Sequence, residues 1–254
     1  MVDYLSVVDP LLRSFRSEIL DNFGATDHTE KHDDTVVTEL DRSIEERIRK
    51  VLEKTYPNIG VHGEEFGKSG NENVYWLVDP IDGTENFIRG IAGIGTIIGL
   101  VEDGKVVFTA IYEPLQDEMY HACKGEGAFM NNKKIAFSKR SLSSSFYQVV
   151  GAQADDQFLR VMKLMDEHSV SALRLFGAAQ QAMLLASGKI DGSIHLYARG
   201  SDWDYAPGRL LVSEAGAEII YFDVEDEIAS RSYAVLPPTH TKLIREELIR
   251  AVNG

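Results

Sequence analysis

Between residues 61 and 130 the chain changes from helical to strand-like sequence, and this stretch limits the possible folds more than any other. Its apolar segments are short, rich in β-branched and aromatic residues, and separated by turn residues: 74–79, 94–101, 106–112, 119–123 and 127–131. Segments of this composition are typical of strands. Asp103-Gly104 lies between the second and third segments, and Asp-Gly suits the positive φ angles of a tight hairpin turn. We therefore expect an antiparallel sheet here.

Helical sequence precedes this sheet. Apolar residues recur at helical spacing over residues 3–23 and again over 40–55, so an amphipathic helix is expected in each range. The polar, glycine-led segment 24–34 between them is interpreted as a loop. With 254 residues, the chain has the length of one elongated domain or of two closely packed halves.

The second part of the chain alternates between strand-like and helical segments. The serine-rich stretch 139–145 is the candidate boundary, which gives an N-terminal half over 1–140 and a C-terminal half over 141–254. Strands are expected at 147–150, 192–197, 218–222 and 233–236, and helices near 155–167, 178–187, 205–215 and 239–252. Such alternation favours an α/β half with helices packed on a sheet. The predicted fold class is thus α+β in the first half and α/β in the second.

Charge and composition exclude several kinds of partner. Lys and Arg number 26 against 40 Asp and Glu, a net charge of −14, so we expect no nucleic-acid partner, because such binding depends on neutralising phosphates. The first residues include acids and no long apolar run, and the weakly polar stretch 90–101 is too short to span a bilayer. No membrane partner is expected. Cys123 is the only cysteine, which excludes an internal disulfide and fits the reducing cytoplasm.

Two carboxylates follow the strand that ends near residue 79. Asp79 and Asp82 flank Pro80, which fixes φ and removes a backbone donor, so both acids can face one point. Carboxylates aimed at one point repel each other unless a proton or a cation lies between them, and Mg²⁺ prefers such oxygen ligands. Gly83 and Thr84 come next, and free N–H groups at a helix start bind phosphate oxygens. An ordinary turn explains this stretch equally well, since Asp-Pro and Asp-Gly are common in turns.

Further acids stand at comparable places in the chain. Glu64 and Glu65 end a short apolar segment just before this strand. Asp204 follows a tryptophan ahead of a predicted helix, and Asp41 lies at the head of the second predicted helix. Each acid has a simple alternative explanation, because adjacent acids are common in solvated loops and an Asp at a helix start is often an N-cap. Their joint occurrence with the Asp-Pro-Ile-Asp stretch is harder to explain in this way.

The order and spacing of these elements resemble the inositol monophosphatase family of Mg²⁺-dependent, lithium-sensitive phosphatases. The matching elements are Asp41, the pair Glu64-Glu65, residues 76–87 and residues 203–208. The family has a glycine pair eleven residues after its Trp-Asp, whereas this chain has Gly216 followed by Ala217. An alanine matters there only if the position needs a positive φ angle. The resemblance implies a layered αβαβα sandwich of the inositol monophosphatase and fructose-1,6-bisphosphatase type, and a homodimer.

The resemblance also implies roles for individual residues. It assigns two to three Mg²⁺ ions to Glu64, Asp79, the carbonyl of Ile81, Asp82 and Asp204. It assigns catalysis, in which an activated water attacks phosphorus in line, to Asp41, Thr84 and Glu64. Contacts to the phosphate and the rest of the substrate fall to Asp82, Gly83, Thr84, Gly177, Ala179, Tyr197, Arg199 and Asp204.

The substrate stays open at this point. Inositol-specific relatives have a glutamate seven residues before the Asp of Trp-Asp, where this chain has Tyr197. Arg199 could bind a second anionic group, although a surface arginine is an equally good interpretation. The resemblance implies hydrolysis of a small phosphorylated metabolite like inositol monophosphate. The alternatives are fructose 1,6-bisphosphate, histidinol phosphate or a 3'-phosphoadenosine nucleotide as substrate, or a suppressor-type regulatory binding protein.

Overall fold

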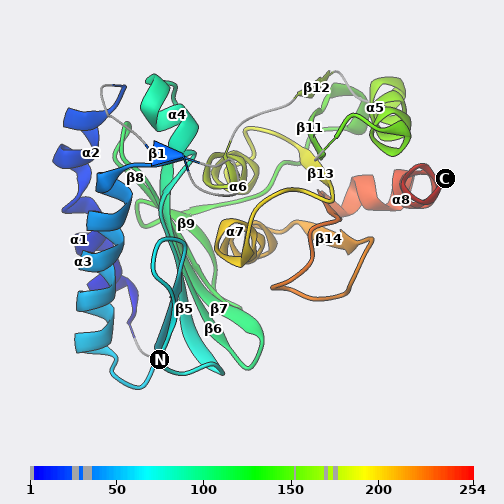
Figure 1. Cartoon of the computed structure of the whole chain (residues 1–254). Coiled ribbons are helices and arrows are strands. Elements are labelled where there is room, and N and C mark those ends of the chain that lie inside the picture. Colours follow the sequence, from blue (N-terminus) through cyan, green and yellow to red (C-terminus); the bar gives the residue numbers. More distant parts are fainter. Residues whose placement is uncertain (1–2, 25–28, 31–35, 152, 169–170, 174–176) are drawn as a thin grey trace.

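The chain folds into layers of helices and sheets that follow one another across the molecule. The computed structural model describes residues 3–24, 29–30, 36–151, 153–168, 171–173 and 177–254. In Figure 1 an outer group of helices, a large sheet, a central pair of helices, a second sheet and an outer pair of helices succeed one another. The predicted layered αβαβα architecture is confirmed. The loop expected at 24–34 lies largely outside the described residues.

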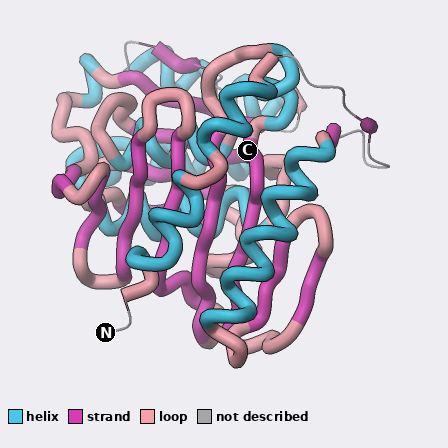
Figure 2. The backbone as a smooth tube through the Cα atoms, turned by 90° about the vertical axis from the view of Figure 1, so that its left-hand side faces the viewer, coloured by secondary structure: helices cyan, strands magenta, loops and turns pink. Residues whose placement is uncertain are grey.

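Helices α1 (Leu5–Arg13), α2 (Arg16–Asn22) and α3 (Glu39–Thr55) form the first layer, which lies in front of the large sheet in Figure 2. The prediction of one helix over 3–23 was wrong, because the helix is interrupted at Ser14. The Ser14 hydroxyl donates to the carbonyl of Leu11 at 2.6 Å, and such side-chain bonds compete with helical ones. The apolar face predicted for this range is nevertheless buried on both sides of the break.

The large sheet has eight strands in the order β10-β9-β8-β7-β6-β5-β3-β4. They are β3 (Gly60–Gly63), β4 (Gly67–Ser69), β5 (Val74–Asp82), β6 (Gly95–Glu102), β7 (Lys105–Glu113), β8 (Glu118–Cys123), β9 (Gly127–Met130) and β10 (Lys133–Ile135). All pairs are antiparallel except β3 with β5, which run parallel because β4 turns back at the sheet edge before β5 begins. The predicted hairpin joins β6 to β7, with φ angles of 49° at Asp103 and 73° at Gly104.

The second sheet is mixed and has the order β12-β11-β13-β15-β14. Its strands are β11 (Phe146–Gly151), β12 (Ser171–Leu173), β13 (Gly192–Leu196), β14 (Glu218–Tyr221) and β15 (Tyr233–Leu236). α5 (Asp156–His168) and α8 (Pro238–Asn253) form the outer layer, and α6 (Ala178–Ala186) and α7 (Asp202–Glu214) lie between the sheets (Figure 1). Each predicted element of this half is present, and α7 begins three residues earlier than expected. The boundary near residue 140 stays a prediction.

Three buried apolar clusters hold the layers together. One packs α1 to α3 on the large sheet, one surrounds α6 and α7 between the sheets, and one packs α5 and α8 on the second sheet.

The remaining elements are short: β1 (Thr29–Glu30), β2 (Val36–Val37), α4 (Thr84–Arg89) and the 3-10 turn Leu142–Ser144. No helix within the described residues is both long and apolar enough to cross a membrane. Of the two central helices, α6 starts beside the carboxyl end of β5, where its first N–H groups donate to Asp82.

Candidate active site

The carboxyl end of β5 carries Asp79 and Asp82 on one side of a bulge. β5 pairs regularly with β6 up to Asp79 and again at Asp82, with a register shift between them. Pro80 has no N–H to donate within the bulge, and its carbonyl accepts a hydrogen bond from the Thr96 hydroxyl at 2.8 Å. Residues three apart in a regular strand point to opposite faces, so the bulge is what lets both carboxylates face one point. Both side chains are buried.

Three carboxylates meet at this point. Asp79, Asp82 and Asp204 each offer an oxygen that lies within 4.8 Å of those of the other two. Asp204 comes from the first turn of α7, so the cluster joins the large sheet to the central helices. Glu64 directly follows β3, and its backbone N–H donates to the carbonyl of Val78 at 3.2 Å. The structure therefore brings Glu64 beside the same end of β5.

Asp41 and Asp204 occupy the same position in their helices. Each is the third residue of its helix and closes a capping box with the N-cap residue, Thr38 in α3 and Ser201 in α7. Asp41 Oδ2 accepts the Thr38 backbone N–H at 3.0 Å, and its Oδ1 faces the hydroxyl of Thr84 at 3.4 Å. Asp204 Oδ2 likewise accepts the N–H of Ser201. One oxygen of each acid holds a helix start, which leaves the other for the site.

Asp82 is held at the start of α6. Its two oxygens accept the backbone N–H groups of Ala178 and Ala179 at 3.1 and 2.8 Å, where the helix dipole stabilises a negative charge. Gly177 precedes them with a φ angle of 78°, and a Cβ there would lie 2.8 Å from Asp82 Oδ2. Only glycine fits this close approach. Gly177 and Ala179, which the resemblance assigned to the substrate, therefore also anchor a carboxylate.

The acids of the cluster hold their protons more tightly than ordinary carboxylic acids. Burial is the largest cause, and it raises the pKa of Asp82 to about 7 and the pKa values of Asp41 and Asp204 to about 6. The pKa of Asp79 is raised well above its usual value, by burial and then by the charge of Glu64. Repulsion of this kind is relieved by a cation bound among the carboxylates. An all-oxygen donor set of this charge fits Mg²⁺.

A cavity of about 200 Å³ opens on the acid cluster. Its lining residues are Asp82, Gln148, Val150, Gly177, Ala178, Gln181, His195, Arg199, Asp204 and Tyr205. Arg199 borders the cavity, as the resemblance implies for a substrate contact. Tyr197 does not line it, because a φ angle of 49° at this residue ends β13 and leaves the ring 60% exposed. The cavity instead contains His195, two residues earlier, which the sequence analysis missed.

A family comparison agrees with this geometry. The model of the inositol monophosphatase family matches residues 7–253. The chain belongs to this family. It is 33% identical over 195 residues to the Nus factor SuhB of Xylella fastidiosa, covering 74% of this chain and 70% of that protein. It is 36% identical over 198 residues to the histidinol-phosphatase of Chlorobaculum parvum, covering 73% and 72%. The Thermotoga maritima IMPase structure superposes with a TM-score of 0.86 at 28% identity, covering 99% and 97%.

One departure from the inositol monophosphatase pattern has no cost in backbone strain. Gly216 adopts a φ angle of 108°, whereas Ala217 is not among the described residues with positive φ. The second glycine of the family pair is thus replaced at a position that any residue tolerates.

A buried ion pair supports the Glu64-Glu65 turn. Glu45 and Arg49 both belong to α3. The Glu45 carboxylate accepts the backbone N–H of Glu65 at 2.7 Å and pairs with Arg49 Nε at 2.8 Å. A Cβ at Gly63 would lie only 2.2 Å from Glu45 Oε1, so a larger residue here would displace the Glu45 carboxylate. α3 therefore positions both Asp41 and the turn that carries Glu64. Glu45 and Arg49 were not identified from the sequence, although their i,i+4 spacing is that of a helical ion pair.

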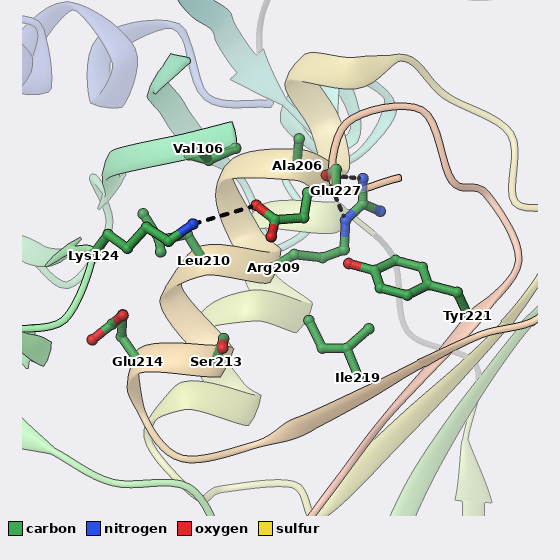
Figure 3. Close-up of a pocket in the computed structure, with 10 residues that line it drawn as sticks. All are labelled: Val106, Lys124, Ala206, Arg209, Leu210, Ser213, Glu214, Ile219, Tyr221 and Glu227. Carbon is green, nitrogen blue, oxygen red and sulfur yellow. Dashed lines mark hydrogen bonds and ion pairs between the residues drawn. The ribbon is translucent and has the colours of Figure 1, made fainter. Parts of the chain in front are cut away.

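A second cavity, of about 280 Å³, lies beside α7 (Figure 3). Lys124 and Glu227 face each other across it at 3.9 Å. Arg209 also lines it, and its guanidinium donates to the carbonyls of Glu227, Ile228 and Ser230 at 2.8 to 3.1 Å. The cavity contains none of the residues that the resemblance assigns to catalysis or metal binding. The acid cluster, and not this cavity, is therefore the candidate active site.

Proposed function

We propose that this chain is a Mg²⁺-dependent phosphomonoesterase that hydrolyses a small phosphorylated metabolite. The observation that carries the proposal is the meeting of Asp79, Asp82 and Asp204 within 4.8 Å, beside a cavity that Asp82 and Asp204 line. Membership of the inositol monophosphatase family and relatives named as phosphatases support it.

The proposed metal ligands are the acids of the cluster and one backbone oxygen. Glu64, Asp79, the carbonyl of Ile81, Asp82 and Asp204 would hold two to three Mg²⁺ ions. Bound there, the ions would lower the pKa of water and neutralise charge on the phosphate oxygens. The raised pKa values of the metal-free acids support this assignment. Burial is their largest cause and the charges of neighbouring carboxylates add to it, and a bound cation would stabilise the ionised acids against both effects.

Asp41 and Thr84 are the proposed groups that move the proton. The Thr84 hydroxyl lies 3.4 Å from Asp41 Oδ1 and 3.0 Å from the carbonyl of Ile81, so either oxygen can accept its proton. The Thr84 oxygen would accept a proton from the attacking water, and the Thr84 hydroxyl proton would pass to Asp41 Oδ1. A pKa raised to about 6, mainly by burial, suits Asp41 to act as a base near neutral pH.

The substrate is proposed only as a class. Named relatives differ in what their names say they act on, so the family supports phosphate-ester hydrolysis more strongly than any one ester. Arg199 at the rim of the cavity supports a substrate with a second anionic group, such as a sugar bisphosphate. By the same resemblance we expect inhibition by millimolar Li⁺, a homodimer and a cytoplasmic location.

A regulatory binding protein is the second candidate, because one relative is named as a Nus factor. A protein that only binds a partner has no chemical need for the acids of the cluster together with Thr84 opposite Asp41. Enzymatic activity of the isolated chain distinguishes the two functions.

Phosphate release from a panel of esters, with and without Mg²⁺, tests the proposed function. The panel contains inositol phosphate, fructose 1,6-bisphosphate, histidinol phosphate and a 3'-phosphoadenosine nucleotide. We expect Mg²⁺-dependent turnover of at least one ester, and a loss of at least about 100-fold in Asp82→Asn, beyond what is usual for residues that only support a metal ligand. Asp156→Asn, at an exposed position on α5, is the matched control and keeps full activity. Equal turnover by Asp82→Asn, or none by the parent protein, contradicts the proposal.

A further inference from the structure

Polar groups without partners lie buried beneath the candidate active site. Both ring nitrogens of His195, the hydroxyl of Ser193 and Nε2 of Gln181 have no hydrogen-bond partner among the described residues. The three side chains are 1%, 0% and 5% exposed, respectively. Ser193 and His195 are two apart on β13 and thus share one face of the strand, opposite Gln181 on α6. Burying such groups without partners is costly, so they point to a ligand or to bound water.

Two cavities meet at these groups. His195 and Gln181 line the 200 Å³ cavity that contains Asp82 and Asp204, and they also line a small cavity of about 20 Å³. Ser193 lines only the smaller one. A cavity of this size has room for about one water molecule, which could bond to Ser193 and to the inner side of His195 and Gln181. The remaining polar groups of His195 and Gln181 are then left to bind a ligand in the 200 Å³ cavity.

The ring of His195 is fixed in place. It stacks on Tyr233, with centroids 4.3 Å apart and an angle of 11° between the planes. The Arg209 guanidinium lies over the same tyrosine, 4.7 Å from the ring centroid, and is itself held by the carbonyls that it binds. Burial, and then the charge of Arg209, lowers the pKa of His195 to about 3. The imidazole is therefore neutral at working pH and offers one donor and one acceptor.

The charges around the cavity favour some leaving groups over others. Apart from the proposed metal ligands Asp82 and Asp204, its described lining residues include no carboxylate, and Arg199 is positively charged. An ammonium group in the leaving alcohol would find no counter-charge there and would face a cation. A hydroxyl can both donate to and accept from His195 and Gln181.

We propose that His195, with Gln181 beside it, recognises a hydroxyl of the leaving alcohol, and that the enzyme therefore prefers phosphate esters of polyhydroxylated alcohols over esters that carry an amine. This inference rests on the proposed function and adds to it the chemistry of the leaving group. It also sets histidinol phosphate, which carries an amine, apart from the sugar and inositol phosphates.

Paired substrates test the preference directly. Hydroxyethyl phosphate and aminoethyl phosphate differ only in a hydroxyl against an ammonium group, and inositol phosphate and histidinol phosphate extend the comparison to larger alcohols. We expect kcat/KM to be at least about 10-fold higher for the hydroxyl member, the discrimination that leaving a buried polar group unpaired brings. Equal values, or a preference for the amine, overturn the inference.

Substitution of His195 assigns the preference to this residue. His195→Phe keeps a ring to stack on Tyr233 but removes both nitrogens, and His195→Gln restores a neutral hydrogen-bonding group. In His195→Phe we expect kcat/KM for the hydroxyl esters to fall about 10-fold more than for p-nitrophenyl phosphate, mainly through KM, with partial recovery in His195→Gln. His121→Phe is the matched control, because His121 is a half-buried histidine on β8 whose Nε2 is likewise buried without a hydrogen-bond partner among the described residues. An equal fall for all esters means a structural role and overturns the inference.

Binding separates this inference from the proposed function. In an Asp41→Asn background, where hydrolysis is expected to be slow, calorimetry with Mg²⁺ present measures the affinity of each ester. If the parent protein hydrolyses no ester but still binds hydroxyl esters more tightly than amine esters, the proposed function is wrong and the recognition by His195 stands. If neither turnover nor affinity depends on the leaving group, the recognition by His195 is wrong whatever the outcome for hydrolysis.

Discussion

Single carboxylates in this protein serve a helix and the site at once. Asp41 and Asp204 each give one oxygen to a capping box, and Asp82 accepts two N–H groups at the start of α6. These bonds fix the side chains before any ion or substrate arrives, so little ordering is left for the moment of binding. Burial, and then neighbouring charge, still raises the pKa values of Asp82 and Asp204, although these hydrogen bonds act to lower them.

At Thr84 we expect the hydroxyl, and not the size of the side chain, to matter for the rate. Thr84→Val keeps the shape but removes the group that lies 3.4 Å from Asp41 Oδ1. Loss of a positioned proton-transfer group should lower kcat by about 100-fold or more in Thr84→Val, whereas Thr84→Ser should keep most of the kcat of the parent enzyme. Steady-state kinetics at saturating Mg²⁺ checks this expectation. A Thr84→Val enzyme as fast as Thr84→Ser would rule out the proposed role.

The acids of the site could be found in the sequence, whereas the histidine beneath them could not. Asp79 and Asp82 stand in one short motif, and Glu64 closes a recognisable strand, so local reasoning reaches them. His195 depends on where β13 ends, which the positive φ angle of Tyr197 decides, and on its stacking against Tyr233 of a neighbouring strand. Neither the turn nor the partner strand can be derived from the sequence near His195.

At the scale of elements, the site lies where helices α6 and α7 start against the end of β5. Helix starts supply N–H groups and the strand end supplies carboxylates, so the site needs the two kinds of element to approach closely. Sequence periodicity predicted both helices. It did not predict that β3 runs parallel to β5, because that depends on β4 turning back at the sheet edge. This parallel pair is what brings Glu64 beside the end of β5.

Two glycine substitutions separate backbone strain from the close approach of α6 to β5. Gly104 and Gly177 both have positive φ angles, 73° and 78°, but a Cβ at Gly104 meets nothing within 4 Å, whereas one at Gly177 lies 2.8 Å from Asp82 Oδ2. Gly104→Ala should cost about 1 kcal/mol of unfolding free energy with activity unchanged. Gly177→Ala should cost more and lower Mg²⁺-dependent activity at least about tenfold, since it displaces a proposed metal ligand. Urea unfolding and steady-state kinetics measure both effects. Equal losses of stability and of activity in the two variants would contradict the close approach of α6 to Asp82.

For the whole molecule, the acid cluster adds local repulsion to a chain that already has a net charge of −14. The cluster lies where three layers meet: the large sheet, the central helices and, through the cavity, β13 of the second sheet. A cation bound there would stabilise the packing of these layers as well as the reaction. Metal binding and folding should therefore be linked.

The metal-free protein should be most stable at mildly acidic pH. Burial raises the pKa of Asp82 from 3.8 to about 7 and that of Asp204 to about 6, so the folded state binds protons that the unfolded state has lost between about pH 4 and about pH 7. The free energy of unfolding must then fall as pH rises through this window and level off above it. Excess Mg²⁺ should reverse the trend, because it binds the ionised acids of the folded protein. Urea unfolding at pH 5 and pH 8, with chelator or with Mg²⁺, measures both effects. In Asp82→Asn the chelator series should lose part of its slope, and an unchanged slope would show that other groups cause the pH dependence.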